Sequence, residues 1–245
     1  MKNIDRNTFY RTYENLIEGK EFVEYKEYYL NSRERFWRSF RKICQLKINH
    51  DSTGTLDIGG GIMAVLLQEL LGHEVYVGDV NERAAADVTK SGISFMHVDL
   101  TSDSISSERQ YDLIVLQEVI EHIPEPPYIT FKKIKSIMNK GGSLIITTPN
   151  GYRLRNILYM ILNMNILDKF RYPGPGESMG HQQEYRLDHM IWHVEQSGLS
   201  VEQAELYDDG WRGSTLVAKI FWKAAALFSV IPHLRNGIMI IAKND

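Results

Sequence analysis

The chain has 245 residues, 43% of them apolar, which is enough for one sizeable core with room for a small appendage. Its formal charge of −3 provides no domain-wide basic field, so we expect no nucleic-acid partner. The single cysteine, Cys44, excludes an internal disulfide, and a reducing, cytoplasmic home is therefore expected.

Aromatic and charged side chains are spread at helical spacing through the first fifty residues. They predict one helix over residues 9–30 and a second over residues 33–47. We interpret residues 1–50 as a helical N-terminal cover that precedes a larger unit formed by residues 51–245.

From residue 55 onward, short apolar runs alternate with helical patterns. The predicted strands cover residues 55–59, 73–79, 93–100, 111–117, 143–150, 200–208 and 237–243. The predicted helices cover residues 62–72, 81–92, 127–142, 186–199 and 214–231, with Asn81 as the N-cap of the second. This alternation predicts an α/β fold with a doubly wound, mostly parallel sheet.

The loop "LDIGGGIMA", Leu56–Ala64, joins the first predicted strand to the following helix. Its glycines let the backbone approach a ligand closely, and the helix N-terminus offers free N–H groups. The pattern Gly59-x-Gly61-x-x-Ala64 satisfies the dinucleotide fingerprint. The same loop, taken as Asp57-x-Gly59-x-Gly61, resembles motif I of the class I S-adenosylmethionine (SAM)-dependent methyltransferases. The loop alone leaves both cofactors open, beside a ligand-free tight turn.

An acidic residue also ends the second predicted strand. With either cofactor, Asp79 would accept hydrogen bonds from the ribose hydroxyls; the structural alternative is a cap for the next helix.

Later segments resemble the methyltransferases and have no counterpart in a nicotinamide oxidoreductase. They are "HVDL" with Asp99, "YDLIVLQ" with Gln117, "KGGSLIITTPN", "HQQEYRLDHMIWHVEQSGL" and the final "NGIMIIAKND". The resemblance implies a Rossmann-like, seven-stranded sheet whose last strand is antiparallel and lies next to the fifth. It also implies S-adenosylhomocysteine as the product, and SAM held by Asp57, Gly59, Gly60, Gly61, Asp79, Val80, Asp99, Leu100 and Gln117.

The stretch "QEVIEH" follows the fourth predicted strand. Glu118, Glu121 and His122 are spaced i, i+3, i+4, which would place them on one face of a helical turn. The stretch resembles the E-x-x-E-H element of ubiquinone-pathway O-methyltransferases and of small-RNA 2′-O-methyltransferases. That resemblance implies a divalent cation held by Glu118, Glu121, His122 and the later His181. Such a mixed oxygen and nitrogen set suits Mg²⁺, Mn²⁺, Fe²⁺ or Zn²⁺.

Three roles stay open for His122: metal ligand, metal-free general base and structural hydrogen-bonding residue. We expect Glu121, His122 and His181 to be the catalytic group of an O-methyltransferase. Its acceptor would be a vicinal-diol, catechol or sugar-type hydroxyl on a small-molecule or saccharide- or lipid-linked compound. The rivals are a metal-free N- or C-methyltransferase, an NAD(P)-dependent oxidoreductase and a non-catalytic SAM-binding protein.

Two covers are expected over the site. Arg33 or Arg35 could pair with the methionine carboxylate of SAM, or could be ordinary surface arginines. Residues 151–183 would form an inserted lid that touches a membrane or a lipid-linked acceptor, or a plain helical cover. The apolar pattern of residues 214–231 could mark a homodimer face, a peripheral membrane contact or packing on the sheet.

Overall fold

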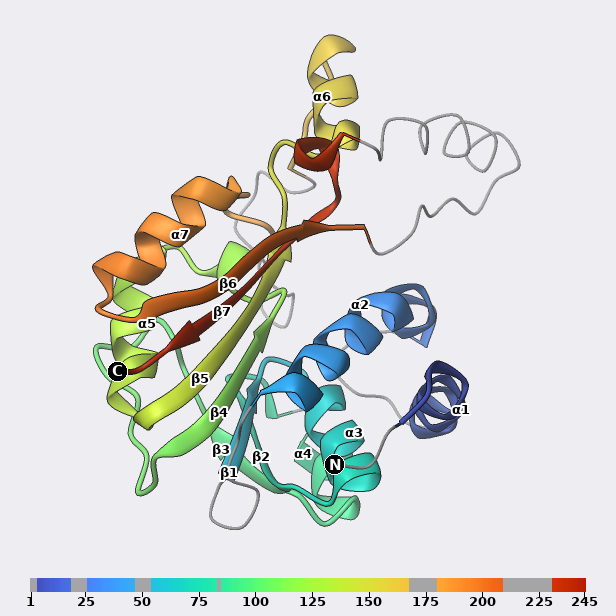
Figure 1. The fold of residues 1–245 in the computed structure, drawn as a ribbon, viewed down its shortest axis with the longest axis vertical. Coiled ribbons are helices and arrows are strands. Elements are labelled where there is room, and N and C mark those ends of the chain that lie inside the picture. The colour runs from blue at the N-terminus through green and yellow to red at the C-terminus, as the bar shows by residue number, and fades with distance from the viewer. Residues whose placement is uncertain (1–3, 19–25, 47–53, 83–84, 168–179, 209–230) are drawn as a thin grey trace.

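The computed structural model describes residues 4–18, 26–46, 54–82, 85–167, 180–208 and 231–245, which form a seven-stranded sheet covered by helices (Figure 1). The strand order is β3-β2-β1-β4-β5-β7-β6. Strand β7 is antiparallel to both of its neighbours, and the other pairs are parallel. The strands are β1 (Gly54–Ile58), β2 (Glu74–Asp79), β3 (Ser94–His97), β4 (Tyr111–Gln117), β5 (Met138–Pro149), β6 (Ser200–Tyr207) and β7 (Gly237–Lys243).

The central strands are buried on both faces. All side chains of residues 113–116 in β4 are fully buried, and residues 144–146 of β5 are their neighbours in the sheet. A parallel strand covered on both faces has no polar face, which is why these segments are continuous apolar runs instead of alternating patterns.

One face of the sheet is covered by α1 (Arg6–Ile17), α2 (Lys26–Gln45), α3 (Ile62–Leu71) and α4 (Ala85–Lys90). Phe9 of α1 packs against Trp37 and Phe40 of α2, with ring centroids 5.1 and 5.0 Å apart. These rings belong to the same buried cluster as the apolar side chains of α3 and of this sheet face. The N-terminal helices therefore share one core with the sheet.

The other face is covered by α5 (Pro127–Ser136) and α7 (Leu187–Gln196) (Figure 1). Helix α6 (Leu154–Ile161) extends away from the sheet beyond the end of β5, and it packs against the short helix η4 (Pro232–Leu234). Among the described residues, no helix is both long enough and apolar enough to cross a membrane.

The predicted sheet is confirmed, including the antiparallel last strand next to the fifth. Several helix predictions were wrong in extent. The first, over residues 9–30, was too long, because α1 ends at Ile17 and the backbone of Glu18 is extended. Helix α2 runs without a break from Lys26 to Gln45, across the predicted division at residues 31–32. Aromatic side chains along α2 are buried in one cluster with those of α1, and this packing favours a continuous helix. Helix α5 ends at Ser136 and residues 138–142 already belong to β5. Helix α4 ends at Lys90, whereas the prediction ran to residue 92. The predicted helix over 214–231 lies almost wholly outside the described residues.

Candidate active site

The carboxyl ends of β1 and β4 lie side by side, because β1 pairs with β2 on one edge and with β4 on the other. The chain order reverses at this point of the sheet, and open α/β sheets bind ligands in the crevice that such a reversal opens. The glycine loop after β1 and the acidic turn after β4 therefore meet. At Gly59, an added Cβ would lie only 2.3 Å from Cγ2 of Val119.

The glycine loop has the backbone shape that its composition predicts. Gly59, Gly60 and Gly61 have φ values of +90°, +121° and +82°, a region that side chains other than glycine rarely adopt. The Gly59 N–H donates to the carbonyl of Gly78 in β2 at 2.9 Å. A Cβ at Gly60 would meet nothing within 4 Å. The loop is thus fixed at its first glycine and open at its second, which fits close approach of a ligand.

Asp57 lies beneath this loop. Its carboxylate accepts a hydrogen bond from the backbone N–H of Ala64 at 3.0 Å, so it holds the start of α3. Burial raises the pKa of Asp57 to about 7, against the opposing hydrogen bonds from Ala64 and Met63. The predicted motif position is therefore a buried carboxyl that shapes the loop from inside.

The predicted acidic positions on β2 and after β3 are neighbours. The backbone N–H of Val98 donates to the carbonyl of Asp79 at 3.1 Å. Oδ1 of Asp79 accepts from the N–H of Asn81 at 2.7 Å, so Asp79 organises the loop that leads to α4. The role of Asn81 as a helix cap stays a prediction. Burial raises the pKa of Asp79, whereas hydrogen bonds from Thr101 lower that of Asp99.

Two apolar residues beside these acids differ in exposure. Val80 is 59% exposed, whereas Leu100 is buried. An exposed valine between a glycine loop and two carboxylates offers an apolar surface of the kind on which a base ring packs.

Gln117, the last residue of β4, is buried against α2. Its Nε2 donates to Oγ of Ser39 at 2.6 Å. Its Oε1 is buried and has no hydrogen-bond partner among the described residues. Because a buried, unpartnered amide oxygen is costly, a ligand donor at this position would relieve it.

Glu118 does not share a helical face with Glu121 and His122. Glu118 has a left-handed backbone, with φ of +55°, so the predicted single helical face was wrong. Its carboxylate lies 3.2 Å from the guanidinium of Arg35 and accepts from Oγ1 of Thr147 at 3.1 Å. Arg35 is buried and also donates to the Tyr28 hydroxyl at 2.6 Å, whereas Arg33 pairs with Glu14.

Glu121 and His122 belong to the single turn η2 (Ile120–His122), and the chain returns to them sixty residues later. The N–H of Gln182 donates to the carbonyl of Glu121 at 2.7 Å, which places His181 against the turn. Ligand atoms of Glu121, His122 and His181 all lie within 4.8 Å of one another, and the two imidazole rings are 4.9 Å apart. Glu118 is not a member of this group.

The Glu121 carboxylate is fully buried. Its Oε2 accepts from Oγ1 of Thr148 at 2.9 Å, while Oε1 has no hydrogen-bond partner among the described residues. Burial, and then the charge of Glu118, raises the pKa of Glu121 well above its usual range. A buried carboxylate oxygen of this kind beside two imidazoles fits a divalent cation, which would compensate the charge.

A second carboxylate contacts this group, and the sequence analysis did not single it out. Oε1 of Glu184 lies 3.1 Å from Nδ1 of His181 and 2.5 Å from the guanidinium of Arg153. Its Oε2 accepts from Nδ2 of Asn156 at 2.6 Å. Burial opposes ionisation, but the hydrogen bond from His181, the charge of Arg153 and the Asn156 amide outweigh it, and the pKa of Glu184 is lowered. The sequence signal for it was the segment "HQQEY", which resembles part of a methyltransferase signature and has Glu184 as its acidic residue.

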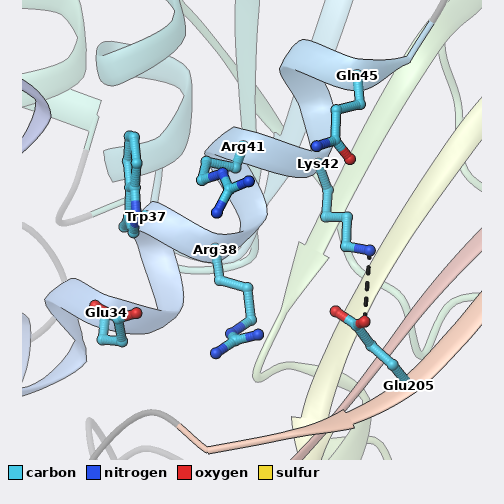
Figure 2. Close-up of a pocket in the computed structure, with 7 residues that line it drawn as sticks. All are labelled: Glu34, Trp37, Arg38, Arg41, Lys42, Gln45 and Glu205. Atoms are coloured by element: carbon cyan, nitrogen blue, oxygen red, sulfur yellow. Dashed lines mark ion pairs between the residues drawn. The ribbon is translucent and has the colours of Figure 1, made fainter. Parts of the chain in front are cut away.

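A separate pocket of about 230 Å³ lies between α2 and β6 (Figure 2). Arg38, Arg41 and Lys42 line it, and Lys42 pairs with Glu205 of β6 at 3.4 Å. None of the cofactor or cation candidates named above lines this pocket. The chemistry is therefore assigned to the carboxyl edge of β1 and β4 and not to this pocket.

A comparison with protein families matches residues 29–204 to a family described as "Methyltransferase domain". The chain belongs to this methyltransferase family. The match begins inside α2 and ends inside β6, so it includes the glycine loop, η2 and His181. The protein accordingly carries a methyltransferase domain.

Curated relatives and solved structures agree with this assignment. Over 114 residues the chain is 27% identical to a ubiquinone biosynthesis O-methyltransferase of Rickettsia bellii, a stretch that covers 43% of this chain and 47% of the relative. The chain thus spans about half the length of the curated relatives it matches.

Among solved structures, a SAM-dependent methyltransferase from Archaeoglobus fulgidus is 16% identical, with a TM-score of 0.57, covering 89% of this chain and all of that one. Magnesium protoporphyrin IX methyltransferase from Synechocystis, solved with bound S-adenosylhomocysteine, is 15% identical, with a TM-score of 0.58 and 98% of each chain covered. At these identities the likeness shows the fold.

Proposed function

We propose that this methyltransferase methylates a hydroxyl group, with assistance from a divalent cation held by Glu121, His122 and His181. The acceptor would be a vicinal-diol, catechol or sugar-type hydroxyl on a small-molecule or saccharide- or lipid-linked compound. The observation that carries the proposal is the convergence of one fully buried carboxylate with two imidazoles at the carboxyl end of β4.

The acceptor chemistry follows from what a hydroxyl needs. SAM supplies an activated methyl group when bound, so the protein must align the acceptor and favour its deprotonated oxygen. A divalent cation lowers the pKa of a hydroxyl that it binds, and two adjacent hydroxyls can chelate it. The role of Glu121 would be to supply the anionic ligand, and the two histidines would supply neutral nitrogen ligands. Glu118 is engaged with Arg35, so its predicted place in the ligand set would require that pair to open.

The cofactor would lie across the loops after β1, β2 and β3. The methionine part of SAM would approach the open backbone at Gly60. A hydrogen-bond donor of the same methionine part would bind the unpartnered Oε1 of Gln117. Asp79 and Val80 would meet the ribose and the base, while Asp57 holds the loop in place. The remaining predicted contacts are Gly59, Gly61, Asp99 and Leu100.

The division into a helical cover, residues 1–50, and a domain of residues 51–245 with a lid over 151–183 is part of this proposal. Helix α6 in that lid has an exposed apolar end at Met160, Ile161 and Leu162, and Ile161 is 74% exposed. This supports a lipid-linked acceptor, because an apolar tail would cover those side chains. The homodimer and the peripheral membrane contact stay predictions.

The experiment is calorimetric titration of the purified chain with S-adenosylhomocysteine, first in EDTA and then with Mg²⁺, Mn²⁺ or Zn²⁺. We expect one cation per chain, lost in Glu121→Gln and His181→Ala while S-adenosylhomocysteine still binds. His189→Ala is the matched control, because this exposed histidine lies on α7 outside the group.

The same proteins are then assayed for methyl transfer to catechol-type acceptors. We expect transfer that EDTA abolishes and added cation restores. Cofactor binding without any bound cation would contradict the proposal and would favour the metal-free N- or C-methyltransferase. Protection by NAD(P)H but not by SAM would reject the whole assignment.

A further inference from the structure

Glu184 is held between the candidate ligand His181 and the start of α6. Its side chain is 2% exposed. One carboxylate oxygen faces both Nδ1 of His181 at 3.1 Å and the guanidinium of Arg153 at 2.5 Å, and the other accepts from Asn156 at 2.6 Å. Arg153 and Asn156 lie at the N-terminus of α6, where Arg153 is the N-cap.

These contacts decide which nitrogen of His181 carries a proton. An ionised carboxylate accepts hydrogen bonds but donates none, and its pairing with the Arg153 guanidinium favours the ionised form. The hydrogen between Glu184 and His181 therefore belongs to Nδ1. A neutral imidazole protonated at Nδ1 keeps its lone pair on Nε2, which is the form in which histidine binds a cation.

The backbone around Glu184 makes this arrangement rigid. The N–H of Gly151 donates to the carbonyl of Tyr185 at 2.8 Å, and a Cβ at Gly151 would lie 3.1 Å from the Glu184 carbonyl oxygen. Nδ2 of Asn156 also donates to the Gly151 carbonyl at 2.9 Å. The segments 151–156 and 181–185 thus pack directly on each other, with the Glu184 carboxylate between them.

We propose that Glu184 is a positioning residue: it fixes the tautomer and ring orientation of His181, and through Arg153 and Asn156 it couples α6 to that ligand. The proposal rests on the cation site of the proposed function. A change in the position of α6 on acceptor binding would be transmitted to His181 through this carboxylate.

The test compares Arg153→Met with the double variant Arg153→Met/Glu184→Met. The double variant removes the Glu184 carboxylate, which accepts the hydrogen bond from His181, and it removes Arg153 as well, so that no arginine loses its partner. The single variant is the matched control, because in it Glu184 still faces His181. Two measurements are made on each: the tautomer of His181 in metal-free, ¹⁵N-histidine-labelled protein by NMR, and the affinities for Mn²⁺ and Zn²⁺ by calorimetry.

We expect the Nδ1–H tautomer in the wild type and in Arg153→Met, and its loss in the double variant with cation affinity about 10–100-fold weaker. Glu184→Gln keeps an acceptor and is expected to retain the tautomer with a smaller loss of affinity; it also serves if the double variant does not fold. A wild-type tautomer and affinity in the double variant, or an Nε2–H tautomer in the wild type, would overturn the proposal. If the wild type binds no cation, the proposed function fails, and the tautomer in metal-free protein still decides the role of Glu184.

Discussion

Replacing Gly59 with alanine tests the contact between the glycine loop and the turn after β4. Gly59 has φ of +90°, and its new Cβ would lie 2.3 Å from Cγ2 of Val119, where carbon atoms normally stay about 3.5–4.0 Å apart. Valine has one strongly preferred rotamer in many settings, so its methyl group does not simply turn away. The variant therefore combines backbone strain with overpacking.

The expected loss can be worked from these two effects. A left-handed backbone costs about 1–2 kcal/mol for an ordinary residue, and overpacking costs about 1–3 kcal/mol. A combined loss of about 3 kcal/mol in a domain of this size lowers the melting temperature by roughly 6–12 °C. Gly72→Ala is the control, since Gly72 has φ of +75° and open space around an added Cβ, so strain alone lowers its melting temperature by roughly 2–8 °C.

The assay is thermal unfolding followed by circular dichroism, with and without S-adenosylhomocysteine. Val119→Ala, placed in the Gly59→Ala background, should recover the overpacking part, and the single Val119→Ala variant completes the double-mutant cycle. If Gly59→Ala melts no lower than Gly72→Ala, or if Val119→Ala brings no recovery, the inferred contact between cofactor loop and acidic turn is wrong.

Three further outcomes are expected. Arg35→Met should lower the free energy of unfolding, measured in urea, by about 3 kcal/mol, because it leaves the Glu118 carboxylate without its arginine. Equal stability of Arg35→Met and the double variant Arg35→Met/Glu118→Gln would contradict this reason. Because the pKa of Asp57 is raised to about 7 in the folded chain from 3.8, the folded state holds a proton that the unfolded state has lost, so this group's contribution to stability falls as pH rises from about 4 to 7. In urea unfolding, the free energy of unfolding of the wild type should therefore fall by about 2–3 kcal/mol more than that of Asp57→Asn between about pH 5 and 7. The same pH dependence in both proteins would refute the assignment. Thr148→Val, which removes the hydroxyl that donates to Glu121, should weaken Mn²⁺ binding about 10-fold by calorimetry, and unchanged affinity would show that this hydroxyl does not orient the carboxylate.

The fold was predictable because its signals are local. Continuous apolar runs separated by helical patterns indicate parallel strands buried on both faces, and β1, β4 and β5 have this form. The loop at Gly59–Gly61 was predictable for the same reason, since its positive φ values require glycine whatever surrounds them. Asp79 and Gln117 are the last residues of β2 and β4, where the predicted strand bounds placed them.

Predictions that depended on packing between elements did less well. The sequence offers a plausible break near residue 31, but burial of Phe36, Trp37 and Phe40 against α1 makes α2 one helix. Likewise, the i, i+3, i+4 spacing after β4 suggested a helical face. The chain instead turns at Glu118 with a left-handed backbone, and its carboxylate faces Arg35 of α2.

By itself, the sequence determined the sheet, the glycine loop and the kinds of side chain available at the carboxyl edge of the central strands. Tertiary structure alone decided which of those side chains meet. His181 reaches Glu121 because the backbone of Gln182 bonds to the Glu121 carbonyl, and Glu184 then joins His181 to Arg153 of the α6 cap. Strand and loop patterns depend on a few neighbouring residues, whereas these contacts join segments about 30 to 60 residues apart in the sequence. No local spacing encodes which distant segments of the chain will pack together.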